Sequence, residues 1–169
     1  MRAKLMVCIL LLMGAACSRS YEVYSHKYPV SFSCDLSQSP FNKVQTSGYF
    51  LSFRPTSLKD GFKVREPNGK EHTIPYTEVQ SRLFKLGLGG LIIGKPYFGD
   101  ETYYAYDLAC PHCDRASSPL SIDEEGFATC AKCHHAYDLN NSGMPKTGDS
   151  RPLYRYRTSI SANTLVVHN

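Results

Sequence analysis

The sequence predicts an all-β protein, a small β-sandwich or barrel that carries a metal-binding subdomain. Three observations support this fold class. Short runs of β-branched and aromatic residues alternate with turn residues along most of the chain. Only one segment has helical periodicity, and two C-x-x-C pairs stand close together in the second half. A chain of 169 residues suits one domain of this kind.

The first predicted strands cover residues 28–36 and 48–53. Residues 61–66 and 71–76 form the clearest hairpin, joined by the turn at 67–70. This turn contains Asn68-Gly69, a pair that suits positive φ at both central positions.

Residues 77–86 are the one predicted helix, because Val79, Leu83 and Leu86 recur at three- and four-residue spacing. The glycines that follow end it. Further short strands are expected at residues 91–93, 102–108 and 126–129. A C-terminal hairpin is expected from residues 153–160 and 165–167.

The N-terminus has the pattern of a secretory signal peptide. Arg2 and Lys4 give a basic start, an apolar run covers residues 5–13, and small residues fill 14–16. The apolar run is shorter than the ~20 residues that a membrane-spanning helix needs. We therefore expect residues 1–16 to be a signal peptide, 17–28 a tether, and 29–169 the β domain.

Cys17 directly follows Ala15-Ala16, an arrangement that resembles the lipobox of bacterial lipoproteins, although Gly14 stands where leucine is usual. The resemblance implies that the Cys17 thiol carries lipid and anchors the chain to a membrane. Several acyl chains hold a protein firmly, at about 0.8 kcal/mol per buried CH₂. Ser18 is not the aspartate associated with inner-membrane retention, so the outer membrane of a bacterial envelope is favoured.

Charge argues against nucleic acid as a partner. Loss of the signal peptide would leave a net charge of about +2, and no run of lysine or arginine occurs. No pattern identifies a small-molecule substrate.

The chemistry is concentrated in two C-x-x-C pairs, Cys110/Cys113 and Cys130/Cys133, with 16 residues between them. Two intervening residues let one tight turn direct both sulfurs at a single point. Two such turns facing each other form a four-sulfur site for a metal ion. We expect the metal-binding subdomain to cover about residues 106–140.

The residues around these pairs resemble Rieske domains. Tyr106-Asp107-Leu108-Ala109-Cys110-Pro111-His112 is similar to their first cluster-binding loop, and Cys130 to Cys133 followed by Tyr137-Asp138-Leu139 to their second. The likeness extends over roughly residues 90–168. It implies a [2Fe–2S] cluster held by two cysteines and two histidines, and a role in electron transfer.

The sequence differs from that family at a ligand position and at the residue after it. Cys133 stands in place of the second histidine ligand, and His134 in place of the usual glycine. Three arrangements follow. All four cysteines can bind one zinc or iron ion, as in a rubredoxin or zinc ribbon, with His112 beside it. A [2Fe–2S] cluster can instead take Cys110 and Cys130 on one iron, and Cys133 with His112 or Cys113 on the other. Least favoured, His112 and His134 are ligands while Cys113 and Cys133 form a disulfide.

The signal segment contains no Arg-Arg pair, so we expect export of an unfolded chain that acquires its metal outside the cell. This favours a single zinc or iron ion slightly over the cluster. Two disulfides are the remaining alternative in an oxidising compartment. Cys34 is interpreted as an inert core thiol, His134 and His135 as loop caps, and Asp123-Glu124-Glu125 as a solvated turn.

Two classes of function remain. The domain can be a membrane-tethered electron carrier that serves a redox partner protein, or a zinc-stabilised binding or assembly protein of the envelope. A closed four-sulfur site has no free coordination position, so we do not expect an enzyme.

Overall fold

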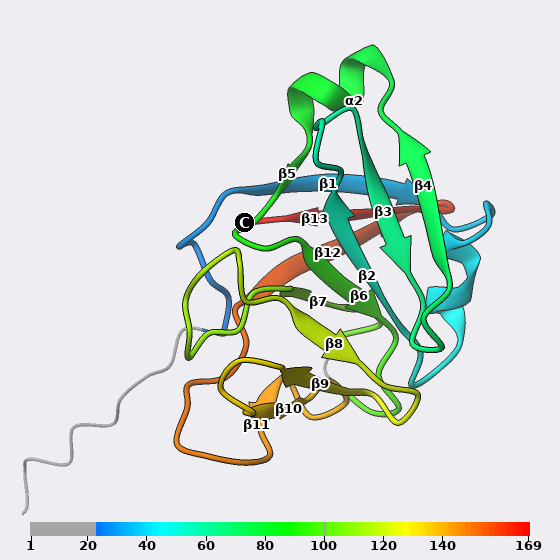
Figure 1. Cartoon of the computed structure of the whole chain (residues 1–169). Coiled ribbons are helices and arrows are strands. Elements are labelled where there is room, and N and C mark those ends of the chain that lie inside the picture. The colour runs from blue at the N-terminus through cyan, green and yellow to red at the C-terminus, as the bar shows by residue number, and fades with distance from the viewer. Residues whose placement is uncertain (1–22, 100) are drawn as a thin grey trace, which may run out of the picture.

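The computed structural model describes residues 23–99 and 101–169, which form two antiparallel sheets (Figure 1). The large sheet has the strand order β4-β3-β2-β6-β7-β12-β13-β1-β5 and the small sheet the order β11-β10-β9-β8. The large-sheet strands are β1 (Val30–Asp35), β2 (Phe50–Pro55), β3 (Gly61–Arg65), β4 (Glu71–Pro75), β5 (Lys85–Leu86), β6 (Leu91–Gly94), β7 (Tyr104–Asp107), β12 (Arg155–Ser161) and β13 (Thr164–His168). The small-sheet strands are β8 (Leu120–Ile122), β9 (Phe127–Cys130), β10 (Ala136–Asp138) and β11 (Met144–Pro145). The predicted all-β class is confirmed.

The β3–β4 hairpin is confirmed, but its turn differs in detail. Only Gly69 has a positive φ, +87°. The turn closes through the Glu66 N–H, which donates to the Lys70 carbonyl at 2.9 Å, and the Gly69 N–H, which donates to the Glu66 carbonyl at 2.9 Å. It is therefore one of the longer hairpin loops that need a single left-handed residue.

The predicted helix is present but short. Helix α2 runs from Glu78 to Leu83 and begins at a capping box formed by Thr77 and Gln80. Leu86 belongs instead to β5, which pairs with β1. Val79 and Leu83 are 63% and 59% exposed, so their spacing does not mark a face that packs on the core. A short 3₁₀ helix, η2 (Phe41–Gln45), was not predicted.

Strands β6 and β7 and the first residues of β2 have buried side chains on both faces, and this shows where the small sheet packs. Phe53, Ile93 and Ala105 point into the main core around Phe32. Their neighbours along the strands, including Phe50, Ile92, Tyr104 and Tyr106, point to the opposite face and pack with small-sheet residues. The small sheet therefore lies on the outer face of the large one, at the lower end in Figure 1.

The predicted signal peptide, Cys17 and residues 17–22 of the predicted tether lie outside the described residues. The described part of the predicted tether contacts the domain at Ser25, whose N–H donates to the Arg155 carbonyl at 2.7 Å. Within the described part of the chain, no helix has the length and apolar character needed to cross a membrane.

Candidate metal centre

The four cysteines lie on two turns of the same design. Cys110 follows β7, and its carbonyl accepts from the Asp114 N–H at 2.8 Å. Cys130 ends β9, and its carbonyl accepts from the His134 N–H at 2.9 Å. Asp114 and His134, each directly after the second cysteine of a pair, have φ of +51° and +60°. A left-handed residue at this point closes each turn, so both sulfurs of a pair lie on its inner side.

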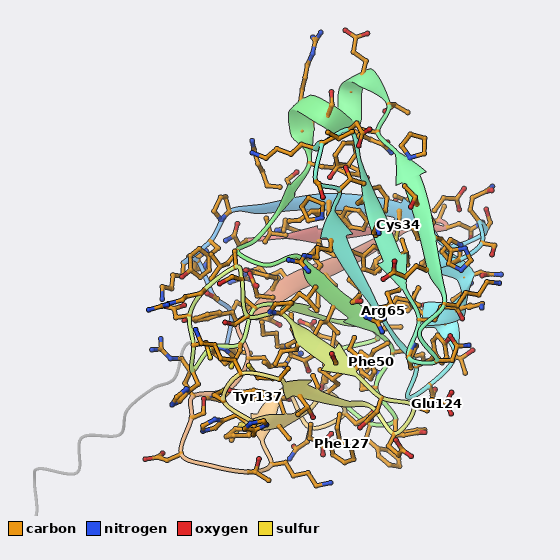
Figure 2. All side chains as sticks on the ribbon, in the orientation of Figure 1. Cys34, Phe50, Arg65, Glu124, Phe127 and Tyr137 are labelled. Carbon is orange, nitrogen blue, oxygen red and sulfur yellow. The ribbon has the colours of Figure 1, made fainter. Side chains whose placement is uncertain are left out.

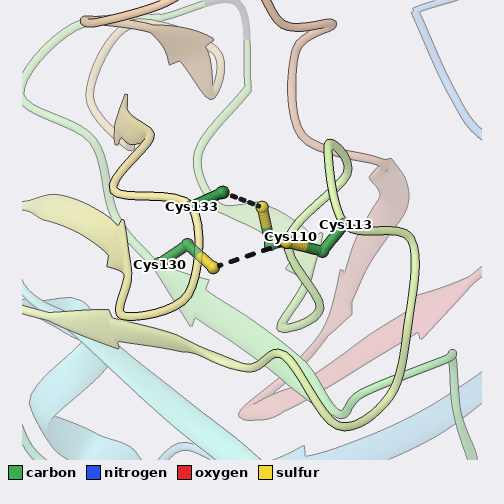
Figure 3. A group of neighbouring side chains, drawn as sticks. All are labelled: Cys110, Cys113, Cys130 and Cys133. Carbon is green, nitrogen blue, oxygen red and sulfur yellow. Dashed lines mark hydrogen bonds between the residues drawn. The ribbon is translucent and has the colours of Figure 1, made fainter.

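The two turns bring all four sulfurs together (Figure 3). The Sγ atoms of Cys110, Cys113, Cys130 and Cys133 all lie within 4.8 Å of one another. Across the turns, Cys110 Sγ lies 3.5 Å from Cys133 Sγ, and Cys113 Sγ lies 3.9 Å from Cys130 Sγ. Four sulfurs placed ~2.3 Å from one ion in a tetrahedron would lie ~3.8 Å apart. The predicted four-cysteine site is thus assembled with spacing that fits one metal ion.

The site has a buried and a partly exposed side. Cys110 and Cys130 are fully buried, whereas Cys113 and Cys133 are partly exposed. The cysteines pack in the same cluster as Leu120, Ala128 and Tyr137 of the small sheet and Leu139, which directly follows β10. The centre is therefore continuous with the core that joins the two sheets.

The protein environment acts differently on the individual thiols. Burial raises the pKa of Cys133 to about 12 and also raises that of Cys113. Burial acts in the same direction on Cys130, but hydrogen bonds from the backbone N–H groups of Cys133 and Lys132, together with those from the Cys133 and Cys110 thiols, lower its pKa overall. The second turn thus supplies N–H groups that favour a thiolate at Cys130.

Tyr137 supports the buried side of the centre. Its hydroxyl lies 3.6 Å from Cys110 Sγ and 3.0 Å from Ser150 Oγ. In Figure 2, Tyr137 lies in the lower part of the molecule with the small sheet, far from Cys34 in the large one. The contact connects the first cysteine to the segment that follows β11.

Asp107, at the end of β7, holds the chain that leads into the first cysteine turn through hydrogen bonds to its carboxylate. Its carboxylate accepts from the N–H groups of Ala109 at 2.7 Å, Leu88 at 2.7 Å and Gly89 at 3.1 Å, and from the Tyr156 hydroxyl at 2.7 Å. Burial raises the pKa of Asp107, and these hydrogen bonds partly offset the effect. The buried carboxylate thereby ties β7 to the glycine-containing loop before β6.

Asp114 connects the same turn to residues 27–28, at the end of the predicted tether. Its carboxylate pairs with the Lys27 ammonium and accepts from the hydroxyls of Tyr28 and Tyr154, both at 2.9 Å. The hydrogen bond from Lys27 lowers the pKa of Asp114 to about 2. Sequence reasoning did not single out these residues, because their contacts cross 86 and 40 positions of the chain.

His112 lies beside the four-cysteine centre, as the arrangement with one metal ion predicted. The structure also brings His135 to this position, a residue that the sequence did not single out as a ligand. The ligand atoms of His112, Cys133 and His135 lie within 4.8 Å of one another. The structure does not bring His134 into either group of converging ligands. Its left-handed backbone continues the turn, and its side chain is exposed. The arrangement with His134 as a ligand therefore has no support in this geometry.

The five described cysteines are free, and the closest sulfur pair across the turns is well beyond the ~2.05 Å of a disulfide bond. Cys34 is buried in the main core, and burial raises the pKa of its thiol to about 12. Its interpretation as a core thiol is confirmed.

The interpretation of residues 123–125 as a solvated turn is also confirmed, since they form an exposed turn between β8 and β9.

Comparisons of the chain with protein-family models, with curated proteins and with solved structures gave no match.

Proposed function

We propose that this protein is a metal-stabilised, membrane-tethered domain of the bacterial envelope, in which Cys110, Cys113, Cys130 and Cys133 hold one ion. The observation that carries the proposal is the placing of four sulfurs within 4.8 Å of one another, two of them buried in the core that joins the sheets and two packed against it. Sulfurs divided between the two irons of a [2Fe–2S] cluster must spread further apart than sulfurs around one ion. The spacing therefore favours a mononuclear site, and zinc is the ion that such sites most often hold.

The ion would stabilise the fold of the small sheet. The strands of the small sheet have between two and four residues each, and sheets this small have little apolar area to bury. Thiolate–metal bonds contribute directly to the folding of such a unit. With four protein ligands the coordination is closed, so we do not propose an enzyme.

The resemblance to Rieske domains is retained as part of the proposal. His134 stands where that family has glycine, and its φ of +60° is a conformation that glycine adopts most easily. This agreement supports descent of the second turn from a cluster-binding loop in which cysteine has replaced the histidine ligand. The signal peptide and the lipid at Cys17 are likewise proposed from the sequence pattern, and they would place the domain on the envelope, with the outer membrane favoured.

A second candidate function is electron transfer to a redox partner protein. The partial exposure of Cys113 and Cys133 favours it, because a centre near the surface is accessible to a partner. This function requires iron, either as a single ion or as a [2Fe–2S] cluster.

Metal analysis of the full chain, purified without chelator, tests both candidates. One zinc per chain and no colour is the expected result. One iron with a visible thiolate spectrum, or two irons with acid-labile sulfide, would support the electron carrier instead. Each of the variants Cys110→Ser, Cys113→Ser, Cys130→Ser and Cys133→Ser should lose the ion, whereas the matched control Cys34→Ser should keep it. Full retention in all four variants would contradict the proposal.

A further inference from the structure

We infer that His112, His135 and Cys133 form a second, outer metal site, in which the Cys133 thiolate is shared between two ions. Their ligand atoms lie within 4.8 Å of one another, and Cys133 also belongs to the four-cysteine set. The inference rests on the function proposed above, because the inner ion holds Cys133 in place.

The two imidazoles come from different turns and meet on one side of the centre. His112 lies between the cysteines of the first pair, and His135 lies two residues after Cys133. Their rings stack with centroids 4.2 Å apart and an interplanar angle of 21°. Folding therefore brings two nitrogen ligands beside one thiolate, and imidazole with thiolate is a ligand set suited to zinc and similar divalent ions.

The His135 ring has one unpaired nitrogen and packs against the backbone of Gly148. Its Nδ1 is buried and has no hydrogen-bond partner among the described residues. An unpaired buried nitrogen is costly, and native proteins usually satisfy such groups. The backbone of Gly148 packs against the ring, since a Cβ built there would lie 2.4 Å from His135 Nε2. Gly148 also has a φ of +78°, so glycine suits this position on both counts.

Charge favours a cation at this position. Four thiolates around one divalent ion leave a formal charge of about −2, and the outer position adjoins one of these thiolates. Three protein ligands leave a coordination position open to solvent, and His112 is exposed. The outer ion should therefore bind more weakly than the inner ion and exchange more readily. Calcium and magnesium prefer oxygen ligands and should not compete.

Cobalt(II) is the probe for the test, because its visible spectrum reports nitrogen and sulfur ligands. The as-purified full chain, carrying its inner ion, is dialysed against increasing cobalt(II), and metals per chain are counted. We expect the total to rise from one ion to two, with new visible bands. His112→Ala and His135→Ala should each remain at one ion. The control His134→Ala, which alters a neighbouring exposed histidine, should reach two.

Each outcome is informative. A wild-type chain that stays at one ion overturns the outer site and leaves the four-cysteine site intact. A second ion retained by both His112→Ala and His135→Ala overturns the assignment of ligands. A chain with no metal overturns the inner site and the outer site together. Retention of the inner ion shows that a variant is folded, and His112 is exposed, so its replacement should not disturb folding.

Discussion

The phenolic oxygen of Tyr137 lies 3.6 Å from Cys110 Sγ, at the buried side of the candidate metal centre. The same hydroxyl lies 3.0 Å from Ser150 Oγ, so it can accept from Ser150 while it donates to the Cys110 sulfur. A fully buried hydroxyl therefore joins a proposed metal ligand to the segment between β11 and β12.

Tyr137→Phe should keep the metal but lower the free energy of unfolding by about 1 kcal/mol, the usual contribution of one hydrogen bond. Denaturant unfolding of the metal-loaded chain measures this change. Ser150→Ala is the control, because it leaves the contact between Tyr137 and Cys110 in place. If the ion is iron, Tyr137→Phe should also lower the reduction potential more than Ser150→Ala does, since hydrogen bonds to sulfur stabilise the reduced state. Equal stability of Tyr137→Phe and wild type would contradict a role for this hydroxyl.

Asp107→Asn should destabilise the domain by about 3 kcal/mol, because an amide offers one acceptor oxygen where the carboxylate serves four donors. The first turn should then be less well ordered and lose its ion more rapidly to a chelator. Asp123→Asn is the matched control, since Asp123 caps an exposed turn through one bond to the Phe127 N–H at 2.7 Å. Thermal unfolding and the rate of metal release should both separate the two variants, and similar behaviour would show that Asp107 does not order the turn.

Glu66 should make stability depend on acid pH. Burial acts to raise its pKa, but hydrogen bonds from Lys43 at 2.6 Å, His72 at 2.8 Å and Tyr49 at 2.9 Å hold it at about 2. A carboxyl whose pKa is lowered by folding stabilises the protein above its unfolded pKa of 4.5, and this contribution is lost as pH falls toward 2.

Glu66→Gln should therefore be about 2 kcal/mol less stable than wild type at pH 7, and this difference should shrink as pH falls from 4.5 toward 2. Glu71→Gln, at an exposed ion pair with Lys63, should cost less and show little dependence on pH. Chemical unfolding at a series of pH values makes the comparison. A difference between Glu66→Gln and wild type that is constant with pH would be inconsistent with the lowered pKa.

Cys34 should not react with iodoacetamide in the native protein, because the residue is only 6% exposed and burial raises the pKa of its thiol to about 12. Peptide mapping by mass spectrometry should find it labelled only after unfolding in denaturant. Labelling of native Cys34 at the rate of a free thiol would mean that β1 opens readily.

Most of the large sheet was predictable from local patterns, whereas only β9 of the small sheet was. Strands such as β1 and β3 have alternating burial that shows directly in their sequence. Strands β8, β10 and β11 have three residues or fewer, too few to show a period. They form because they pack on Phe50, Ile92 and Tyr106 of the large sheet, which are distant in sequence.

The convergence of the four cysteines was predictable because C-x-x-C spacing is a local property of one turn. Which histidine lies beside the cysteines was not predictable, because it depends on which of His134 and His135 takes the left-handed backbone conformation. His134 takes it and turns away, and the next residue, His135, meets His112. The sequence pattern contains two adjacent histidines and does not distinguish them.

X-ray absorption at the metal edge, on the as-purified full chain dialysed against metal-free buffer, tests the central claim most directly. One ion held by Cys110, Cys113, Cys130 and Cys133 predicts a first shell of four sulfurs at ~2.3 Å and no neighbouring metal. Scattering from a second metal at short distance, or nitrogen in place of a sulfur in the first shell, would contradict it.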